Sequence, residues 1–149
     1  MRYDYYHAAV VSDDQDTFEF VSIGPRGRIL KKVVFDTTSH PDIFNLAFGD
    51  VPTNGTMVTD KAITGNEDRN KTLATIAKIV NVYTSAHPQR WVHIRGSTPS
   101  RTRLYKMAIG SNFKELNKMY VIYGYNKDGE LEPFSSEKQF QAFLVKKKN

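Results

Sequence analysis

The chain has 149 residues, no cysteine and a formal net charge of +5 at pH 7. This length predicts a single domain, residues 1–149, with a core that needs no covalent staples, and the lack of cysteine excludes disulfide scaffolds and thiol chemistry. No run of about eighteen apolar residues is present and the first residues lack a secretion signal, so we expect a cytoplasmic protein that does not enter a membrane.

The first third of the chain has the alternating pattern of strands. Phe18 and Phe20 share one face of a strand predicted at 17–23. Residues 24–27, Gly-Pro-Arg-Gly, have turn chemistry, so a second strand at 28–35 is expected to complete a hairpin. Further strands are predicted at 5–11 and 43–48, and residues 56–63 are expected to form either a short further strand or an extended connection.

A long helix is predicted at about 67–87, because apolar residues recur there at steps of three and four. Asn66 is the expected N-cap, with Glu67 and Asp68 in the first turn, where the helix dipole favours negative charge. His87 precedes a proline and is the expected end. We expect this helix to lie across the sheet.

A strand at 90–95 is expected to lead into a second, shorter helix at about 99–109. Thr98 suits the N-cap and Pro99 the first helical position, where a missing N–H costs nothing. Gly110 is the expected C-cap.

The rest of the chain predicts a short helical turn and three more strands. The turn is expected at 111–117 and the strands at 119–125, 130–134 and 140–145, with a helix starting near Ser136 as the alternative to the last strand. The expected fold class is therefore α+β: an antiparallel-rich mixed sheet of about five to seven strands, packed with one long and one shorter helix.

Charge is distributed unevenly along the chain. Residues 69–114 carry nine basic side chains and no acidic one, whereas residues 1–68 carry six basic and eleven acidic side chains. Such asymmetry indicates an anionic partner, or neutralisation of the basic window by the acidic third once the chain folds. Both interpretations stay open from the sequence.

The start of the second helix is the best candidate site within that window. Free N–H groups and the helix dipole favour an anion at such a position, Gly96 permits close approach, and Arg101 is the guanidinium expected to point at the ligand. The predicted anion-binding residues are His93, Arg95, Gly96, Ser97, Thr98, Arg101 and Arg103. The alternative is an ordinary strand-to-helix turn in which Arg101 braces carboxylates of the acidic third.

Aromatic residues suggest a second kind of contact. Single-stranded nucleic-acid binders combine basic grooves with rings on which bases stack, and Tyr105, Tyr123 and Tyr125 are the candidate stacking residues. Tyr123 and Tyr125 share one face of their strand. The alternative is that these rings pack the sheet or a dimer interface.

Catalytic patterns are weak. The four histidines show no metal-ligand spacing, and Ser97 lies outside any nucleophile-elbow pattern. His93, on the same strand face as Arg95, is the one candidate base, and the alternative, which we favour, is that it packs beside Trp91. We expect no metal and no cofactor, and the sequence leaves open whether the protein is an enzyme.

The segments 18–27, 45–50 and above all 96–105, Gly-Ser-Thr-Pro-Ser-Arg-Thr-Arg-Leu-Tyr, resemble a family of small uncharacterised bacterial proteins that is classified as a domain of unknown function. The similarity runs from about residue 5 to residue 147. The resemblance implies a bacterial protein, but it brings no activity and no catalytic residue. The element order also resembles that of whirly-type single-stranded nucleic-acid binders, which is an analogy of fold alone.

Three functions follow as hypotheses. The first is a non-enzymatic module that binds single-stranded nucleic acid or another polyanion through residues 90–106. The second is an enzyme or sensor for a small phosphorylated or carboxylated molecule at the helix start, residues 96–103. The third is a protein-interaction domain, as a homodimer or as a toxin–antitoxin component.

Overall fold

The computed structural model describes residues 4–52 and 65–149. Within these residues the fold is α+β, with an eight-stranded mixed sheet and three helices, so the fold class is confirmed while the strand count is above the expected five to seven. The strands are β1 Ala9–Val10, β2 Thr17–Gly24, β3 Gly27–Thr37, β4 Ile43–Asp50, β5 Trp91–Ile94, β6 Tyr120–Tyr125, β7 Leu131–Pro133 and β8 Ala142–Lys147. The helices are α1 Arg69–Ala86, α2 Pro99–Ser111 and α3 Phe113–Met119.

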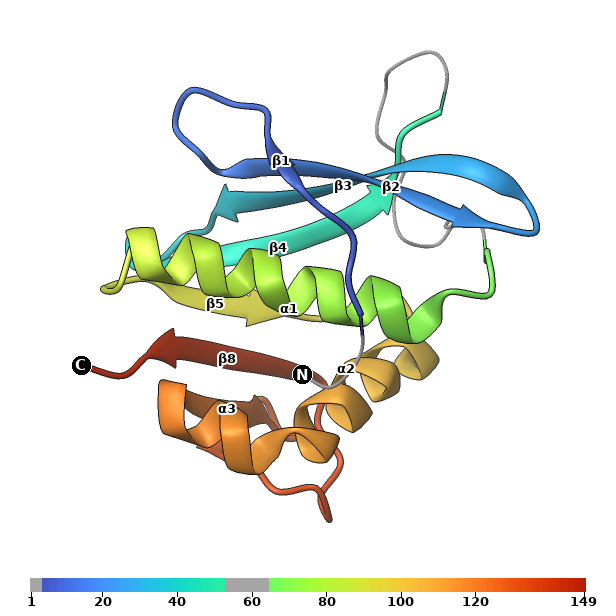
Figure 1. The fold of residues 1–149 in the computed structure, drawn as a ribbon. Helices are drawn as coiled ribbons and strands as arrows, with labels where there is room; N and C mark the ends of the chain where they lie inside the picture. The colour runs from blue at the N-terminus through green and yellow to red at the C-terminus, as the bar shows by residue number, and fades with distance from the viewer. Residues whose placement is uncertain (1–3, 53–64) are drawn as a thin grey trace. The chain divides into compact units, whose positions relative to one another are not determined.

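The chain forms two compact units (Figure 1). The first takes residues 1–36 and 47–83, and the second takes residues 37–46 and 84–149. Both β4 and α1 contribute residues to each unit, so the expectation of a single domain stays a prediction. None of the described helices is long and apolar enough to cross a membrane.

The first unit is built on the predicted hairpin. Strands β2 and β3 pair antiparallel from Thr17↔Val34 to Gly24↔Gly27, and the short β1 adds to the outer side of β2. Helix α1 runs along the strands (Figure 1), and its Tyr83 stacks on Phe35 with ring centroids 3.8 Å apart. Phe18, Phe20, Val33 and Phe35 are all at most 3% exposed, so the shared face predicted for Phe18 and Phe20 is part of the core of this unit.

The start of α1 differs from expectation. The helix begins at Arg69 and has no acidic residue in its first turn, so the prediction that Asn66 caps it is wrong. Asn66 is instead 3% exposed, and its side chain accepts a hydrogen bond from the Arg26 amide and donates to Gly27 O. The amide side chain therefore closes the β2–β3 turn, a long-range role that outweighs its local capping propensity.

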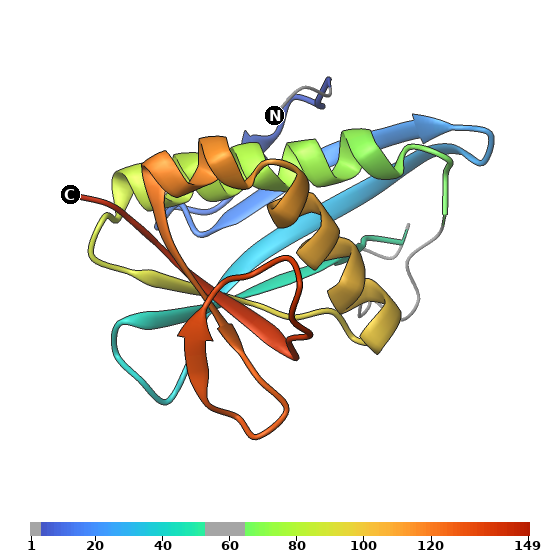
Figure 2. The same cartoon turned by 90° about the horizontal axis from the view of Figure 1, so that it is seen from below.

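Within the second unit the strand order is β4-β5-β8-β6-β7. The first residues of β4 pair parallel with β5, and the remaining pairs are antiparallel. The last strand, β8, is inserted between β5 and β6, which excludes the alternative helix near Ser136. Figure 2 shows the β6–β7 hairpin extending beyond the helices of this unit. The strand or extended connection expected at 56–63 lies outside the described residues.

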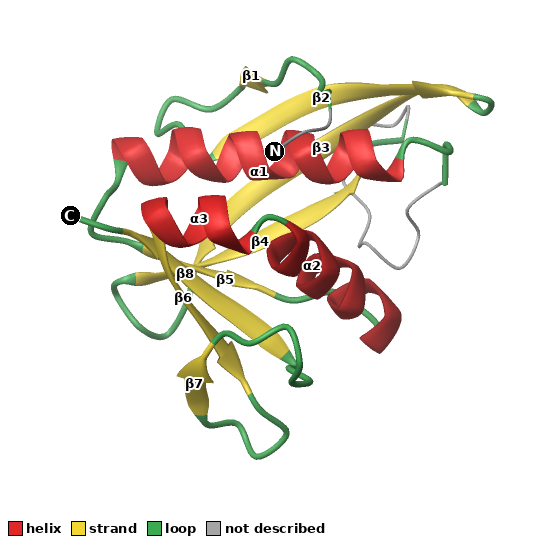
Figure 3. Ribbon diagram, turned by 60° about the horizontal axis from the view of Figure 1, so that its bottom comes forward, coloured by secondary structure: helices red, strands yellow, loops and turns green. Residues whose placement is uncertain are grey.

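Helices α2 and α3 cover one face of the second unit's strands (Figure 3). Inward residues of these strands are at most 8% exposed: Val92, Ile94, Tyr120, Ile122, Phe143 and Val145. Phe134 joins this core, with ring centroids 5.4 Å from Phe113 and 5.8 Å from Phe140. Gly110 lies inside α2 and Asn112 is the C-cap, so the predicted stop at Gly110 is wrong. The short turn expected at 111–117 is the separate helix α3.

Candidate functional site

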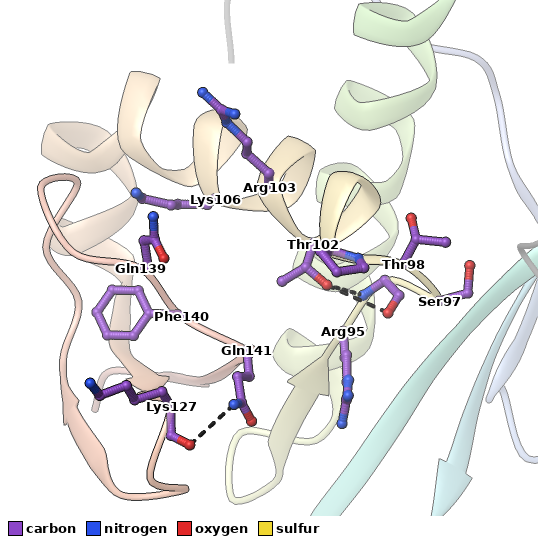
Figure 4. Close-up of a pocket in the computed structure, with 12 residues that line it drawn as sticks. Arg95, Ser97, Thr98, Thr102, Arg103, Lys106, Lys127, Gln139, Phe140 and Gln141 are labelled. Carbon is purple, nitrogen blue, oxygen red and sulfur yellow. Dashed lines mark hydrogen bonds between the residues drawn. The ribbon is translucent and has the colours of Figure 1, made fainter.

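A pocket of about 640 Å³ opens beside the first turns of α2, entirely within the second unit. Three parts of the chain line it (Figure 4). They are the connection from β5 to α2 with the facing side of α2, the β6–β7 turn, and the segment before β8. The lining residues are Arg95, Gly96, Ser97, Thr98, Pro99, Thr102, Arg103, Lys106, Lys127, Gln139, Phe140 and Gln141.

The connection from β5 to α2 is held by its own side chains. The Thr98 hydroxyl accepts from the Arg101 amide at 3.2 Å, which is the predicted N-cap, and Pro99 occupies the start of the helix as expected. The buried Thr102 hydroxyl accepts from the Gly96 amide at 3.1 Å. A Cβ at Gly96 would lie 2.5 Å from Thr102 N, so only glycine lets the helix approach this closely.

This geometry changes the basis of the predicted anion site. Pro99 has no N–H and the Arg101 amide is already bonded to Thr98, so two of the four amides at the helix start do not serve a ligand. The space beside Gly96 is filled by the backbone and side chains of the helix, so it leaves no room there for a ligand. The amides of the helix start therefore give little support to the predicted anion site, and the side chains around them decide what the pocket offers to a ligand.

Four cationic side chains line the pocket. Arg95 precedes the turn, Arg103 and Lys106 come from α2, and Lys127 comes from the β6–β7 turn. Arg95, Arg103 and Lys127 are exposed and Lys106 is half-buried. The lining contains no carboxylate, and none of the four forms an ion pair with a carboxylate of residues 4–52 or 65–149.

The period of α2 decides which of its residues line the pocket. Positions 99, 102, 103 and 106 lie on one helical face, because residues three and four apart are neighbours on a helix. All four line the pocket. Arg101, the guanidinium favoured from sequence, is on a different face and does not line the pocket, whereas Arg103 does.

The opposite wall is held against the end of β6. The Gln141 amide donates to Tyr125 O at 2.8 Å, and its side-chain nitrogen donates to Lys127 O at 3.2 Å, the bond drawn in Figure 4. The Phe140 ring packs closely against Gly124, where an added Cβ would be 2.3 Å from Phe140 Cδ1. Gln139 and Gln141 are exposed and offer amide groups that can both donate and accept.

The pocket brings together five of the seven residues predicted to bind an anion. These are Arg95, Gly96, Ser97, Thr98 and Arg103; Arg101 and His93 do not line it. Sequence reasoning missed seven lining residues: Pro99, Thr102, Lys106, Lys127, Gln139, Phe140 and Gln141. Helical spacing from Arg103 could have found Lys106, whereas the last four have no local signal.

Aromatic residues gather on the face of the second unit's strands that α2 and α3 do not cover. The Trp91 and Tyr123 rings are 5.9 Å apart and the His93 and Tyr125 rings 5.8 Å apart. All four side chains are half-buried. The shared face of Tyr123 and Tyr125 was predicted; Tyr105 lies on α2, away from this strip.

His93 is a member of this strip and is the candidate base. Burial, and then the nearby charge of Arg95, lower the pKa of His93 below its usual 6.5. Its Nδ1 lies 3.0 Å from Asn45 Oδ1, so the amide fixes the ring orientation. A neutral, held imidazole outside the pocket is suited to ring contacts more than to proton transfer.

Metal ligation has no candidate group here. Within the described residues, no cluster of three or more histidine or acidic side chains is placed to hold a metal ion.

The positive surplus belongs to the second unit alone. The residue ranges of the first unit contain nine basic and ten acidic residues, a net charge of −1. Those of the second unit contain twelve basic and six acidic residues, a net charge of +6. By count, the first unit is therefore nearly neutral and the positive surplus lies in the residues of the second unit.

Comparison with known proteins places the chain in a family without assigning a function. No curated protein and no solved structure gives a significant match to it. The match to a protein family extends over residues 2–148, nearly the whole chain. On that extent the chain belongs to the family of unknown function DUF6934.

Proposed function

We propose that the protein is a binding module for a phosphorylated ligand, with the phosphate group held in the basic pocket beside α2. One observation carries the proposal: four cations from three segments of the chain line one concavity that contains no carboxylate. A cleft lined by charges of one sign raises the local concentration of ions of the opposite sign. The net charge of +6 over this unit's residues acts in the same direction.

The size of the pocket favours an organic phosphate over a free ion. A volume of about 640 Å³ lies within the range typical of small-molecule sites and exceeds what one phosphate group fills. Arg95 and Arg103 offer forked donors that suit phosphate oxygens, and Lys106 and Lys127 add point charges. Gln139 and Gln141 can hydrogen-bond the uncharged part of the ligand.

Titration calorimetry with inorganic pyrophosphate at low salt tests the proposal. Pyrophosphate presents the common chemistry of phosphorylated ligands without committing to one of them. Arg103→Gln and Lys106→Gln should each weaken its binding by about tenfold, because a hydrogen bond to a charged group contributes about 1.5–3 kcal/mol. Arg101→Gln is the matched control: it makes the same charge change on the same helix but away from the pocket, and should change binding less than about twofold.

Two results would contradict the proposal. One is a wild-type protein that gives no heat with pyrophosphate at millimolar concentration. The other is an equal loss of affinity in Arg101→Gln and Lys106→Gln, which would mean that net charge rather than this pocket attracts the anion. A homodimer and a toxin–antitoxin role stay predictions beside this one.

A further inference from the structure

The aromatic strip of the second unit leads toward the basic pocket. Strand β8 lies between β5 and β6, with His93↔Leu144 and Leu144↔Tyr123 as neighbours across the sheet. The Trp91–Tyr123 and His93–Tyr125 ring pairs therefore form two successive steps above β8. They follow the direction in which β5 and β6 both run.

Cations stand at both ends of this strip. Arg95 follows His93 by two residues and Lys127 follows Tyr125 by two residues, and both line the pocket. At the far end, Lys146 Nζ lies 5.5 Å from the centre of the Trp91 ring. The surface thus runs from one cation over two ring pairs to the pocket.

We propose that this strip binds the bases of a single-stranded nucleic acid whose phosphate occupies the basic pocket; the inference rests on the proposed function of that pocket. Bases stack on aromatic side chains while cations track the backbone, a combination typical of single-strand binders. Two steps of two residues each advance about 6.6 Å per step along a strand. The spacing of the ring pairs exceeds the ~3.4 Å rise per nucleotide of one strand in a duplex. Successive bases would therefore be too far apart to stack on each other, and each would stack on a protein ring instead.

The composition of the face fits a polyanion with apolar bases. Its residues on β5, β8 and β6 include no carboxylate: Trp91, His93, Val121, Tyr123, Tyr125, Ala142, Leu144 and Lys146. On the neighbouring β7, Leu131 pairs with Tyr125 and is 48% exposed, which extends the apolar surface outward. A duplex keeps its bases stacked inside and cannot use such a strip.

Trp91 makes the test direct, because it is the only tryptophan in the chain. We would titrate the protein with 5′-phosphorylated single-stranded DNA and RNA of about ten nucleotides, a length within the usual site sizes. Base stacking on the strip should quench Trp91 fluorescence with saturation, and the matching duplex should bind at least tenfold more weakly. The DNA and RNA arms distinguish which strand is preferred.

Ring variants sharpen the assignment. Tyr123→Leu and Tyr125→Leu should each weaken oligonucleotide binding by about tenfold, the usual effect of losing one stacked base. Tyr125→Phe keeps the ring and should stay within about twofold. Lys146→Gln should reduce the slope of log affinity against log salt by about 0.7. Unchanged pyrophosphate binding in all four variants shows that they fold.

The results separate the two proposals. Pyrophosphate binding without Trp91 quenching by any oligonucleotide would overturn the strip while leaving the pocket. Equal affinity for a mononucleotide and for the oligonucleotide would also overturn it, since the strip would then add nothing. Loss of pyrophosphate binding itself would refute the pocket first. The fluorescence titration of the wild-type protein tests the strip even if a leucine variant fails to fold, because it needs no variant.

Discussion

The two units treat polar groups in opposite ways. In the first unit charged and polar side chains are buried and bonded: Lys31 and Asp50 are 2% and 6% exposed and form an ion pair of 2.6 Å. In the second unit Arg95, Arg103 and Lys127 are exposed at the rim of a pocket without carboxylates. Buried charges require partners because desolvation is costly. Exposed charges stay hydrated and therefore need no partner within the protein. The contrast separates residues that hold the fold from residues available to bind.

The Asp68 cluster is a second example from the first unit. Ser22 and Tyr6 hydroxyls donate to Asp68 Oδ2 at 2.5 and 2.7 Å, and Asn66 donates to Ser22 at 3.1 Å. Ser22 is fully buried, so this network ties the N-terminal segment, β2 and the start of α1 together. A serine beside a carboxylate here is structural, because its oxygen has no access to a substrate.

The difference between the two units is tested most directly by replacing one lysine with methionine in each unit and comparing the loss of stability. Lys31→Met leaves Asp50 buried without its cation, and we expect the free energy of unfolding to fall by about 3–5 kcal/mol. Lys106→Met, the matched control, should change the free energy of unfolding by less than about 0.5 kcal/mol, because its removal leaves no buried carboxylate without a cation. Urea unfolding followed by circular dichroism measures both. Equal losses would refute the distinction.

A double variant tests whether the unpaired charge of Asp50 causes the stability loss expected for Lys31→Met. Lys31→Met combined with Asp50→Leu removes both charges and should recover most of the lost stability.

The stability of the second unit depends on the close packing of Gly124 against the Phe140 ring, beside the pocket. Gly124→Ala would place a methyl group 2.3 Å from the Phe140 ring, so the ring must move and the unfolding free energy should drop by about 1–3 kcal/mol. Gly110→Ala is the control: its nearest contact is 3.4 Å, and alanine is the better helix former by about 1 kcal/mol. Thermal unfolding compares them, and a stable Gly124→Ala would show that Phe140 is loosely held.

The smallest expected effect concerns Asp68 and pH. Burial raises the pKa of Asp68, but the hydrogen bonds from Ser22, Tyr6 and Thr72 together bring it below 3.8. A carboxyl whose pKa is lower in the folded state stabilises the fold above its unfolded pKa and loses that contribution as pH falls through the folded pKa. Asp68→Asn should therefore cost about 1 kcal/mol at pH near 6.

That difference should disappear in strong acid, where the carboxyl is protonated in both states. Urea unfolding of wild type and variant across this pH range is the measurement. A difference that persists in strong acid would assign the loss to side-chain shape instead of charge.

Local signals predicted several of the residues that line the second unit's pocket. Thr98 and Pro99 fix the start of α2 because capping and proline geometry depend only on neighbours. The spacing of Arg103 and Lys106 could have placed both on the pocket face. The preference for Arg101 rested on distance along the chain, which is a poor guide to direction on a helix. The alternation in β3 also contained a missed signal, since Lys31 shares the buried face of Val33 and Phe35.

By itself, the sequence determined the hairpin of the first unit, the long helix, the cap of α2 and the excess of positive charge, because each depends on residues within a few positions. Only the tertiary structure decided that β8 enters between β5 and β6, and that Lys127 and Gln141 meet Arg95 at one pocket. Pairings between distant strands depend on register and on the packing of the whole sheet, and no local pattern contains that information.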